Sequence, residues 1–182
     1  MLPCVIALSS RMGAGKSTIA QALSDRLGWP RVSFGDYVRE VARVRGLQES
    51  RSVLQQLGES LVQDDPRSLT AAVLSKVNIR SGAVIDGVRH TQILKTIREL
   101  VAPLAVVLVY VETEEKLRIQ RLVRRGMTVD EIQAADCHSN EMQVKGVLRE
   151  SAVLKVRGDG DTAEAVDAIS ETLSNRISSD PF

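Results

Sequence analysis

The chain has 182 residues, enough for a single domain with a sizeable core, and its composition is that of an ordinary globular protein. Its 24 basic and 23 acidic side chains leave a net charge of +1, which argues against binding nucleic acid by general phosphate attraction. Aromatic residues make up only 3% of the chain, so it offers no stacking platform for single-stranded bases.

The two cysteines, Cys4 and Cys137, do not have the spacing of a metal site or a disulfide framework. The N-terminal apolar run is too short for a membrane span and lacks the basic start of a signal peptide. We therefore expect a cytoplasmic protein with no nucleic-acid or membrane partner, which is a monomer or a weak homodimer.

The first predicted strand, Cys4–Leu8, is followed by a glycine-rich turn and then by an amphipathic helix over Ser17–Leu27. The turn matches the phosphate-loop template G-x-x-x-x-G-K-[ST], except that Ser10 stands at the first glycine position. Gly13 and Gly15 allow the backbone to turn its N–H groups toward anionic oxygens. The alternative is a plain strand-to-helix turn, but strand, loop and helix occur in the order that a phosphate loop requires.

This loop predicts a binding site for a nucleoside triphosphate such as ATP. Lys16 is expected to reach the β- and γ-phosphates, Ser17 to be a Mg²⁺ ligand, and Thr18 to contact the α-phosphate. The predicted nucleotide-binding residues of the loop are Gly13, Ala14, Gly15, Lys16, Ser17 and Thr18.

The second predicted strand, Arg31–Phe34, leads directly to Asp36, and Arg39 lies one helical turn later on the same side. Asp36 has several interpretations that the sequence leaves open. It can cap a helix, belong to the Mg²⁺ shell, or act as a base toward an acceptor hydroxyl.

No strand pattern occurs between Phe34 and Ala83. Helical patterns fill the interval instead, at Tyr37–Arg45, Ser52–Val62 and Leu69–Lys76. We expect an inserted helical subdomain over residues 35–80. Its side chains Arg51, Gln55 and Gln63 could read a base edge, although solvated helix positions are the simpler interpretation.

The third predicted strand, Ala83–Ile85, ends at Asp86, and Arg89 follows three residues later. Phosphate-loop enzymes need a carboxylate at the end of a neighbouring strand to complete the Mg²⁺ shell. The carboxyl ends of parallel strands meet at one edge of a sheet, so Asp86 is a candidate metal ligand. The alternative for Asp86 is a turn residue.

The fourth predicted strand, Ala105–Val111, leads to a basic helix over Thr113–Arg125. Arg121 and Arg125 lie one turn apart on a single face of it, just before Gly126. Its other cations are assigned to a solvated face; they are Lys116, Arg118 and Arg124. An irregular stretch, 126–140, follows.

A fifth strand, Ala152–Val156, and a last helix, Thr162–Ile177, complete the pattern. Strands alternating with helices predict an α/β fold, a three-layer doubly wound sheet of five parallel strands. The organisation is one domain over 1–182, with the helical insertion and the short segment 126–140 as additions.

In their order along the chain, these motifs resemble those of the P-loop nucleoside monophosphate kinases, the adenylate-kinase-like branch that includes dephospho-CoA-kinase-like proteins. Besides the phosphate loop, four segments carry the resemblance: Ser33–Arg39 is similar to Gly-Asp-x-x-Arg, Asp86–Arg89 to Asp-Gly-x-x-Arg, Arg121–Arg125 to the arginine pair at the root of the lid, and Val156–Gly160 to the last strand and loop. The segment from Ala135 to Glu141 departs from the family's Arg-Asp-x-x-Glu, because it has an Asp but not the preceding Arg.

The resemblance implies that MgATP is the donor and that residues 35–80 bind a phosphorylated acceptor. It assigns Arg39 and Arg89 to the acceptor phosphate, with Asp36 beside them, and Asp86 to the Mg²⁺ shell. It places Arg121 and Arg125 on the transferring phosphate and Gly160 near the donor base, with 126–140 as a short lid.

The expected catalytic residues are Lys16, Asp36, Arg89, Arg121 and Arg125. A nucleoside monophosphate is the expected acceptor. A kinase of a small-molecule hydroxyl such as that of dephospho-CoA, and a nucleotide-binding regulatory protein with little turnover, remain as alternatives.

Overall fold

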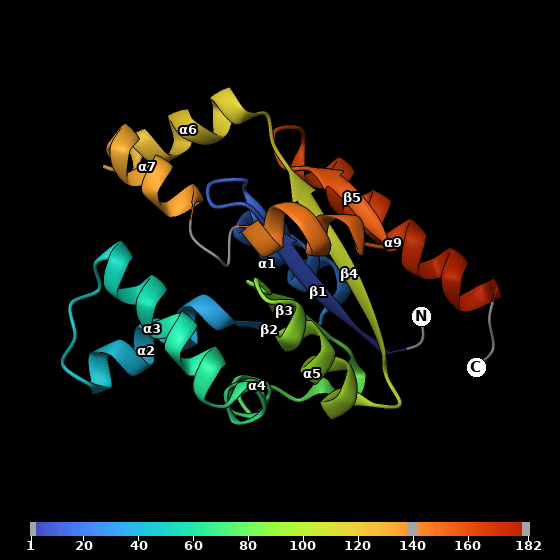
Figure 1. Cartoon of the computed structure of the whole chain (residues 1–182). Helices are drawn as coiled ribbons and strands as arrows, with labels where there is room; N and C mark the ends of the chain where they lie inside the picture. The colour runs from blue at the N-terminus through green and yellow to red at the C-terminus, as the bar shows by residue number, and fades with distance from the viewer. Residues whose placement is uncertain (1–2, 138–141, 180–182) are drawn as a thin grey trace.

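A computed structural model describes residues 3–137 and 142–179 of the chain (Figure 1). Its centre is a sheet of five strands in the order β2-β3-β1-β4-β5, and every pairing between neighbours is parallel. The strands are β1 (Cys4–Ser10), β2 (Arg31–Ser33), β3 (Ala83–Asp86), β4 (Ala105–Glu112) and β5 (Leu154–Arg157). This confirms the predicted fold class, and β5 begins two residues later than expected.

The central strand β1 is buried along its whole length and separates two apolar cores. Val5 and Ala7 face one core, whereas Cys4, Ile6 and Leu8 face the other. Because helices cover both faces of the sheet, this strand has no side exposed to water. The sequence showed this as an unbroken apolar run and not as an alternation.

One face of the sheet is covered by α1 (Lys16–Leu27) and α9 (Thr162–Ser179), which pack against each other. The other face carries α4 (Pro66–Leu74), α5 (Thr91–Val101) and a short π-helix, η2 (Val144–Leu148). Neither α5 nor η2 was among the elements expected from the sequence. The result is the three-layer arrangement that the alternation of strands and helices predicts.

The helical insertion lies between β2 and β3, at one end of the sheet (Figure 1). It contains α2 (Phe34–Val44), α3 (Arg51–Asp64) and α4, followed by a single 3₁₀ turn, η1 (Ile79–Ser81). Ser33 caps α2 by accepting from the backbone N–H of Asp36, and Asp65 caps α4. All three helices were expected, within three residues at each end.

Two helices follow β4: α6 (Glu115–Arg124) and α7 (Val129–Asp136). In Figure 1 they lie across from the helical insertion. The expectation of an irregular stretch over 126–140 is therefore wrong for α7, which begins with a capping box between Thr128 and Glu131. Residues 138–140 of that stretch, and Glu141 beyond it, lie outside the described residues. Within the described ranges, no helix is both long and apolar enough to cross a membrane.

Candidate functional site

The phosphate loop joins β1 to α1 and has the backbone that its glycines require. Gly13 and Gly15 both lie in the left-handed region, with φ of 85° and 89°. Every other residue of the described chain with a positive φ is also a glycine, so Ser10 occupies the first template position with an ordinary negative φ. Serine at this position therefore introduces no backbone strain.

Neighbouring elements leave no room for side chains at these glycines. A Cβ on Gly13 would lie 2.9 Å from Cγ of Leu122, and one on Gly15 would lie 3.0 Å from the carbonyl oxygen of Gly158. The loop is thus enclosed by α6 on one side and by the turn after β5 on the other. Its shape is set by its neighbours as well as by its own sequence.

The turn after β5 is joined to the phosphate loop by close packing and hydrogen bonds. Gly158 packs so closely on Ala14 that any Cβ there would overlap the Ala14 carbonyl oxygen. Thr113 donates its hydroxyl to that same carbonyl at 2.8 Å, and Arg121 donates to the carbonyl of Gly158 at 2.8 Å. Gly160, the residue expected near the donor base, lies two positions further along in an exposed part of the turn.

Lys16 and Asp86 meet at the carboxyl edge of the sheet, as the parallel arrangement predicts. The Lys16 ammonium donates to the Asp86 carboxylate, and both side chains are almost fully buried. Arg31 of β2 lies 3.6 Å from the other carboxylate oxygen of Asp86. Asp86 is therefore a buried carboxylate held between two cations, not a simple turn residue.

Ser17 and Asp86, the two predicted metal ligands, carry the kind of oxygen atom that Mg²⁺ prefers. A hydroxyl and a carboxylate are hard oxygen ligands, and Mg²⁺ usually takes one or two of these together with waters and substrate phosphates. No group of three or more His, Cys, Asp or Glu side chains with metal-binding geometry occurs among the described residues. A magnesium ion here would thus depend on phosphate oxygens for much of its coordination.

A cavity of about 100 Å³ lies between the helical insertion and the loop after β3. Arg39 from α2 and Arg89 from the β3–α5 loop both line it, so two predicted acceptor-binding residues from different elements meet there. Gly87 forms part of its wall, and a Cβ on Gly87 would lie 3.9 Å from Nζ of Lys16. We call this space the acceptor cavity after the predicted role of Arg39 and Arg89; it adjoins the buried end of the phosphate loop.

Three further polar residues line this acceptor cavity: Arg51, Gln55 and His90. From the sequence, solvated helix positions were preferred for Arg51 and Gln55; the structure places both in the lining of this cavity. Gln63, grouped with them from the sequence, is exposed two turns further along α3 and is not part of the lining. His90 carried no motif that could have identified it; its Nε2 lies 3.8 Å from a carboxylate oxygen of Glu59.

Asp36 is 57% exposed and is not among the residues that line the acceptor cavity. It is not the cap of α2, because Ser33 has that role. Its carboxylate accepts from Arg39 at 2.8 Å and lies 3.9 Å from Arg31. Arg31 is therefore within reach of both candidate carboxylates, Asp36 and Asp86.

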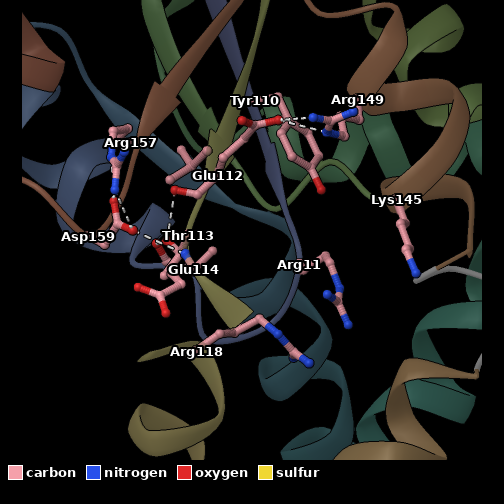
Figure 2. Close-up of a pocket in the computed structure, with 12 residues that line it drawn as sticks. Arg11, Tyr110, Glu112, Thr113, Glu114, Arg118, Lys145, Arg149, Arg157 and Asp159 are labelled. Carbon is pink, nitrogen blue, oxygen red and sulfur yellow. Dashed lines mark hydrogen bonds and ion pairs between the residues drawn. The ribbon is translucent and has the colours of Figure 1, made fainter. Parts of the chain in front are cut away.

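A second, larger cavity of about 490 Å³ lies beside the phosphate loop, under the end of β4 (Figure 2). Arg11 and Lys145 point into the same space from the loop and from η2. Two of its other cations, Arg149 and Arg157, are bound to carboxylates that line the same cavity. Most of the charge around this space is therefore paired.

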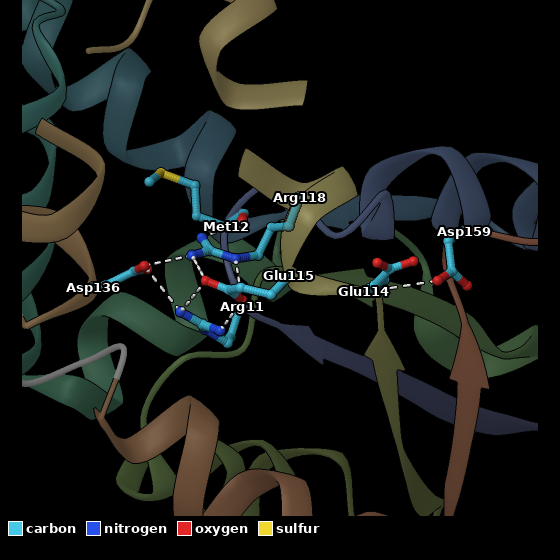
Figure 3. A network of polar contacts seen from close by, with 7 residues as sticks. All are labelled: Arg11, Met12, Glu114, Glu115, Arg118, Asp136 and Asp159. Atoms are coloured by element: carbon cyan, nitrogen blue, oxygen red, sulfur yellow. Dashed lines mark hydrogen bonds and ion pairs between the residues drawn. The ribbon is translucent and has the colours of Figure 1, made fainter. Parts of the chain in front are cut away.

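Arg118 corrects one expectation from the sequence. It was assigned to a solvated face of its helix, but its side chain is only 1% exposed. It donates to the carbonyl oxygen of Met12 at 3.2 Å and to the carboxylates of Glu115 and Asp136 (Figure 3). A buried guanidinium needs several acceptors at once, and these three come from the phosphate loop, α6 and α7.

The charges in this cluster stabilise each other. The hydrogen bond from Arg118 lowers the pKa of the Glu115 carboxyl below its usual range. Burial opposes the charge on Arg118, but its hydrogen bonds to Glu115 and Asp136 outweigh burial and raise its pKa. Arg125, the other arginine expected at the lid root, is the exposed C-cap residue of α6 and lies outside this cluster.

Sequence comparison finds relatives of this chain among known proteins. A family model described as an AAA domain matches residues 12–136. A UPF0200 protein of Pyrobaculum aerophilum is 30% identical over 126 residues, which cover 69% of this chain and 68% of that relative. An adenylate kinase of Nocardia farcinica is 28% identical over 138 residues, covering 72% of this chain and 74% of that enzyme.

Among solved structures, the shikimate kinase of Acinetobacter baumannii in complex with shikimate superposes with a TM-score of 0.64. The alignment covers 100% of this chain and 97% of that one, at 17% sequence identity. At this level of identity the likeness shows the fold and nothing more specific.

Proposed function

We propose that this chain transfers the terminal phosphate of MgATP to a nucleoside monophosphate. The chain belongs to the AAA_17 family of P-loop AAA domains, and its motifs and fold are kinase-like. One observation carries the proposal. Arg39 and Arg89, from two separate elements, line one cavity whose wall at Gly87 adjoins Lys16. An acceptor phosphate bound by these arginines would therefore lie next to the donor end.

The donor would occupy the phosphate loop. The N–H groups of the loop and the N-terminus of α1 face anionic oxygens there, and Lys16 exchanges Asp86 for the β- and γ-phosphates. Magnesium held by Ser17 and Asp86 would neutralise phosphate charge during transfer. Arg121 already bridges α6 and the turn after β5, so it lies beside the loop where charge develops.

The reaction needs little proton chemistry if the acceptor is a monophosphate. An ionised phosphate oxygen of the acceptor attacks the γ-phosphorus, and the bond from that phosphorus to the bridging oxygen breaks to release ADP. Arg39 and Arg89 would orient the acceptor oxygen, and closing the site would keep water from taking its place. Asp36 then serves to position Arg39 and not as a base.

Two observations favour a second candidate, a kinase of a small-molecule hydroxyl. Asp36 is largely exposed next to Arg39, which lines the acceptor cavity, and a carboxylate there could accept a proton from an acceptor hydroxyl. The acceptor cavity is also small, which suits a compact anionic alcohol. The structurally similar shikimate kinase is an enzyme whose named ligand is of this kind.

A coupled assay for ADP release separates these candidates. The purified protein with MgATP is tested against all ribo- and deoxyribonucleoside monophosphates, dephospho-CoA and shikimate. We expect ADP release to depend on one or a few monophosphates. Turnover with dephospho-CoA or shikimate alone would replace the proposal by the hydroxyl kinase, and MgATP binding without any turnover would favour a regulatory protein.

A further inference from the structure

Two kinds of contact join α7, the helix of the expected lid, to the phosphate loop. The first is apolar: Met12, directly before Gly13, is buried in a small cluster with Leu122 of α6 and with Ile132 and Ala135 of α7. The apolar side of α7 thus packs on a side chain of the loop itself. A lid that only covered bound substrate would not need such an anchor.

The second contact is ionic and encloses the same part of the loop (Figure 3). Arg11 donates to Glu115 at 2.5 Å and to Asp136 at 2.9 Å. Arg118 donates to the same two carboxylates and also to the carbonyl oxygen of Met12. Two guanidinium groups and two carboxylates therefore form a charge-balanced cluster around residues 11 and 12.

The position of Asp136 suggests that these contacts and not its own helix keep it in place. It is the last residue of α7, where the partial negative charge of the helix end disfavours a carboxylate. Two arginines compensate for that repulsion, and one of them, Arg118, is fully buried. Removing Asp136 would leave a buried guanidinium with fewer acceptors, which is costly.

The loop gains from such support because its shape depends on two glycines. Gly13 and Gly15 give it its shape but also make it flexible, since glycine restricts the backbone least. The contact from Arg118 to the Met12 carbonyl fixes the peptide that leads into Gly13. The direction of the N–H groups that face the phosphates then depends on α6 and α7.

We propose that Arg118 and Asp136 are positioning residues of the donor site: they join α7 to the phosphate loop and hold the loop in its phosphate-binding shape. The inference rests on the proposed function only in taking this loop as the site of MgATP. It also assigns Arg11 a supporting role, since both of its carboxylate partners belong to the cluster. In this arrangement α7 supports the donor site through its contacts with Met12 and Arg118.

The test compares Asp136→Asn with Asp136→Glu and with Asp130→Asn, a matched control that removes one exposed carboxylate from the same helix. Calorimetric titration measures the Kd for MgATP, and hydrogen exchange measures protection of residues 10–15. Asp136→Asn should raise the Kd about tenfold, the equivalent of one charged hydrogen bond, and should speed exchange in residues 10–15. Asp136→Glu should recover part of both effects, and Asp130→Asn should match the wild type.

The outcomes separate this inference from the proposed function. If the wild type binds no MgATP, the proposed function fails, while exchange in residues 10–15 still reports on positioning. An Asp136→Asn protein with wild-type Kd and wild-type exchange would overturn the inference. So would faster exchange throughout the chain with an unchanged Kd, which marks a merely structural role. If Asp136→Asn does not fold, Arg11→Gln tests the same cluster from its more exposed side.

Discussion

The two ends of the candidate site are built in different ways. At the donor end, charges are buried and paired: Lys16 with Asp86, and Arg118 with Glu115 and Asp136. At the acceptor end, Arg39 is well exposed, and its partner Asp36 is more than half exposed. The donor end is preorganised by the fold, whereas the acceptor end presents side chains that a ligand can still rearrange.

This difference has a physical consequence for function. Buried and paired charges hold one geometry, and changing them affects both folding and binding. Exposed charges on helices contribute little to stability, so the acceptor end can vary without endangering the fold. A domain built in this way can therefore keep the same donor site while the side chains of its acceptor end change.

The largest expected effect is at Lys16. Lys16→Ala removes the cation that reaches the β- and γ-phosphates and should lower kcat about a thousandfold or more. It also leaves the buried Asp86 with Arg31 as its remaining cation in contact, so the melting temperature should fall as well. Initial rates and a thermal melt measure the two effects, and full turnover in this variant would disprove the donor site.

The second-largest effect should appear at the acceptor end, in the KM for the acceptor. Arg89→Ala removes charge-assisted hydrogen bonds to the acceptor and should raise its KM about 10- to 100-fold, with the KM for MgATP nearly unchanged. Arg67→Ala, on an exposed arginine of α4 outside the cavity, is the control. Equal changes in both KM values would contradict the separation between the two ends.

Asp36 tests what kind of acceptor the site takes. Under the monophosphate proposal, Asp36→Asn loosens Arg39 but removes no base, so kcat should change less than about tenfold. A base acting on a hydroxyl would instead contribute about 10²- to 10⁴-fold, and its loss would flatten the pH profile of kcat. Glu40→Gln, on the same helix and paired with Lys76, gives the baseline.

The smallest effect compares two glutamines on one helix. Gln55 lines the acceptor cavity and Gln63 does not. Gln55→Ala should raise the acceptor KM about three- to tenfold, as expected for one neutral hydrogen bond, and should change the preference among bases. Gln63→Ala should leave both unchanged. If the two variants behave alike, the base is read elsewhere.

The donor end was also the easier end to predict, because its signals are local. Strand, glycines and lysine lie within a few residues of one another, and their spacing alone identifies the loop. Arg118 was misassigned because one of its hydrogen-bond partners, Asp136, is 18 residues away. Asp136 belongs to a helix, α7, in a stretch that had been expected to be irregular. A local signal for that helix existed in the capping box of Thr128 and Glu131.

The acceptor end depends on contacts that the sequence does not specify locally. Arg51 and Gln55 line the acceptor cavity only because α3 packs opposite the loop after β3. The missed helix α5 did carry a signal, since its buried residues Ile93, Ile97 and Val101 recur at helical spacing. The π-helix η2 had none, because its i→i+5 hydrogen bonds follow no common pattern of residues.

Gly158 has a consequence for how this chain can diverge. Its backbone is not in the left-handed region, so nothing local requires a glycine there. The requirement comes from Ala14, whose carbonyl oxygen occupies the place of the missing side chain. Natural variants should therefore hold this position as strictly as the motif glycines, and a motif defined by the phosphate loop alone omits a residue that belongs to it in space.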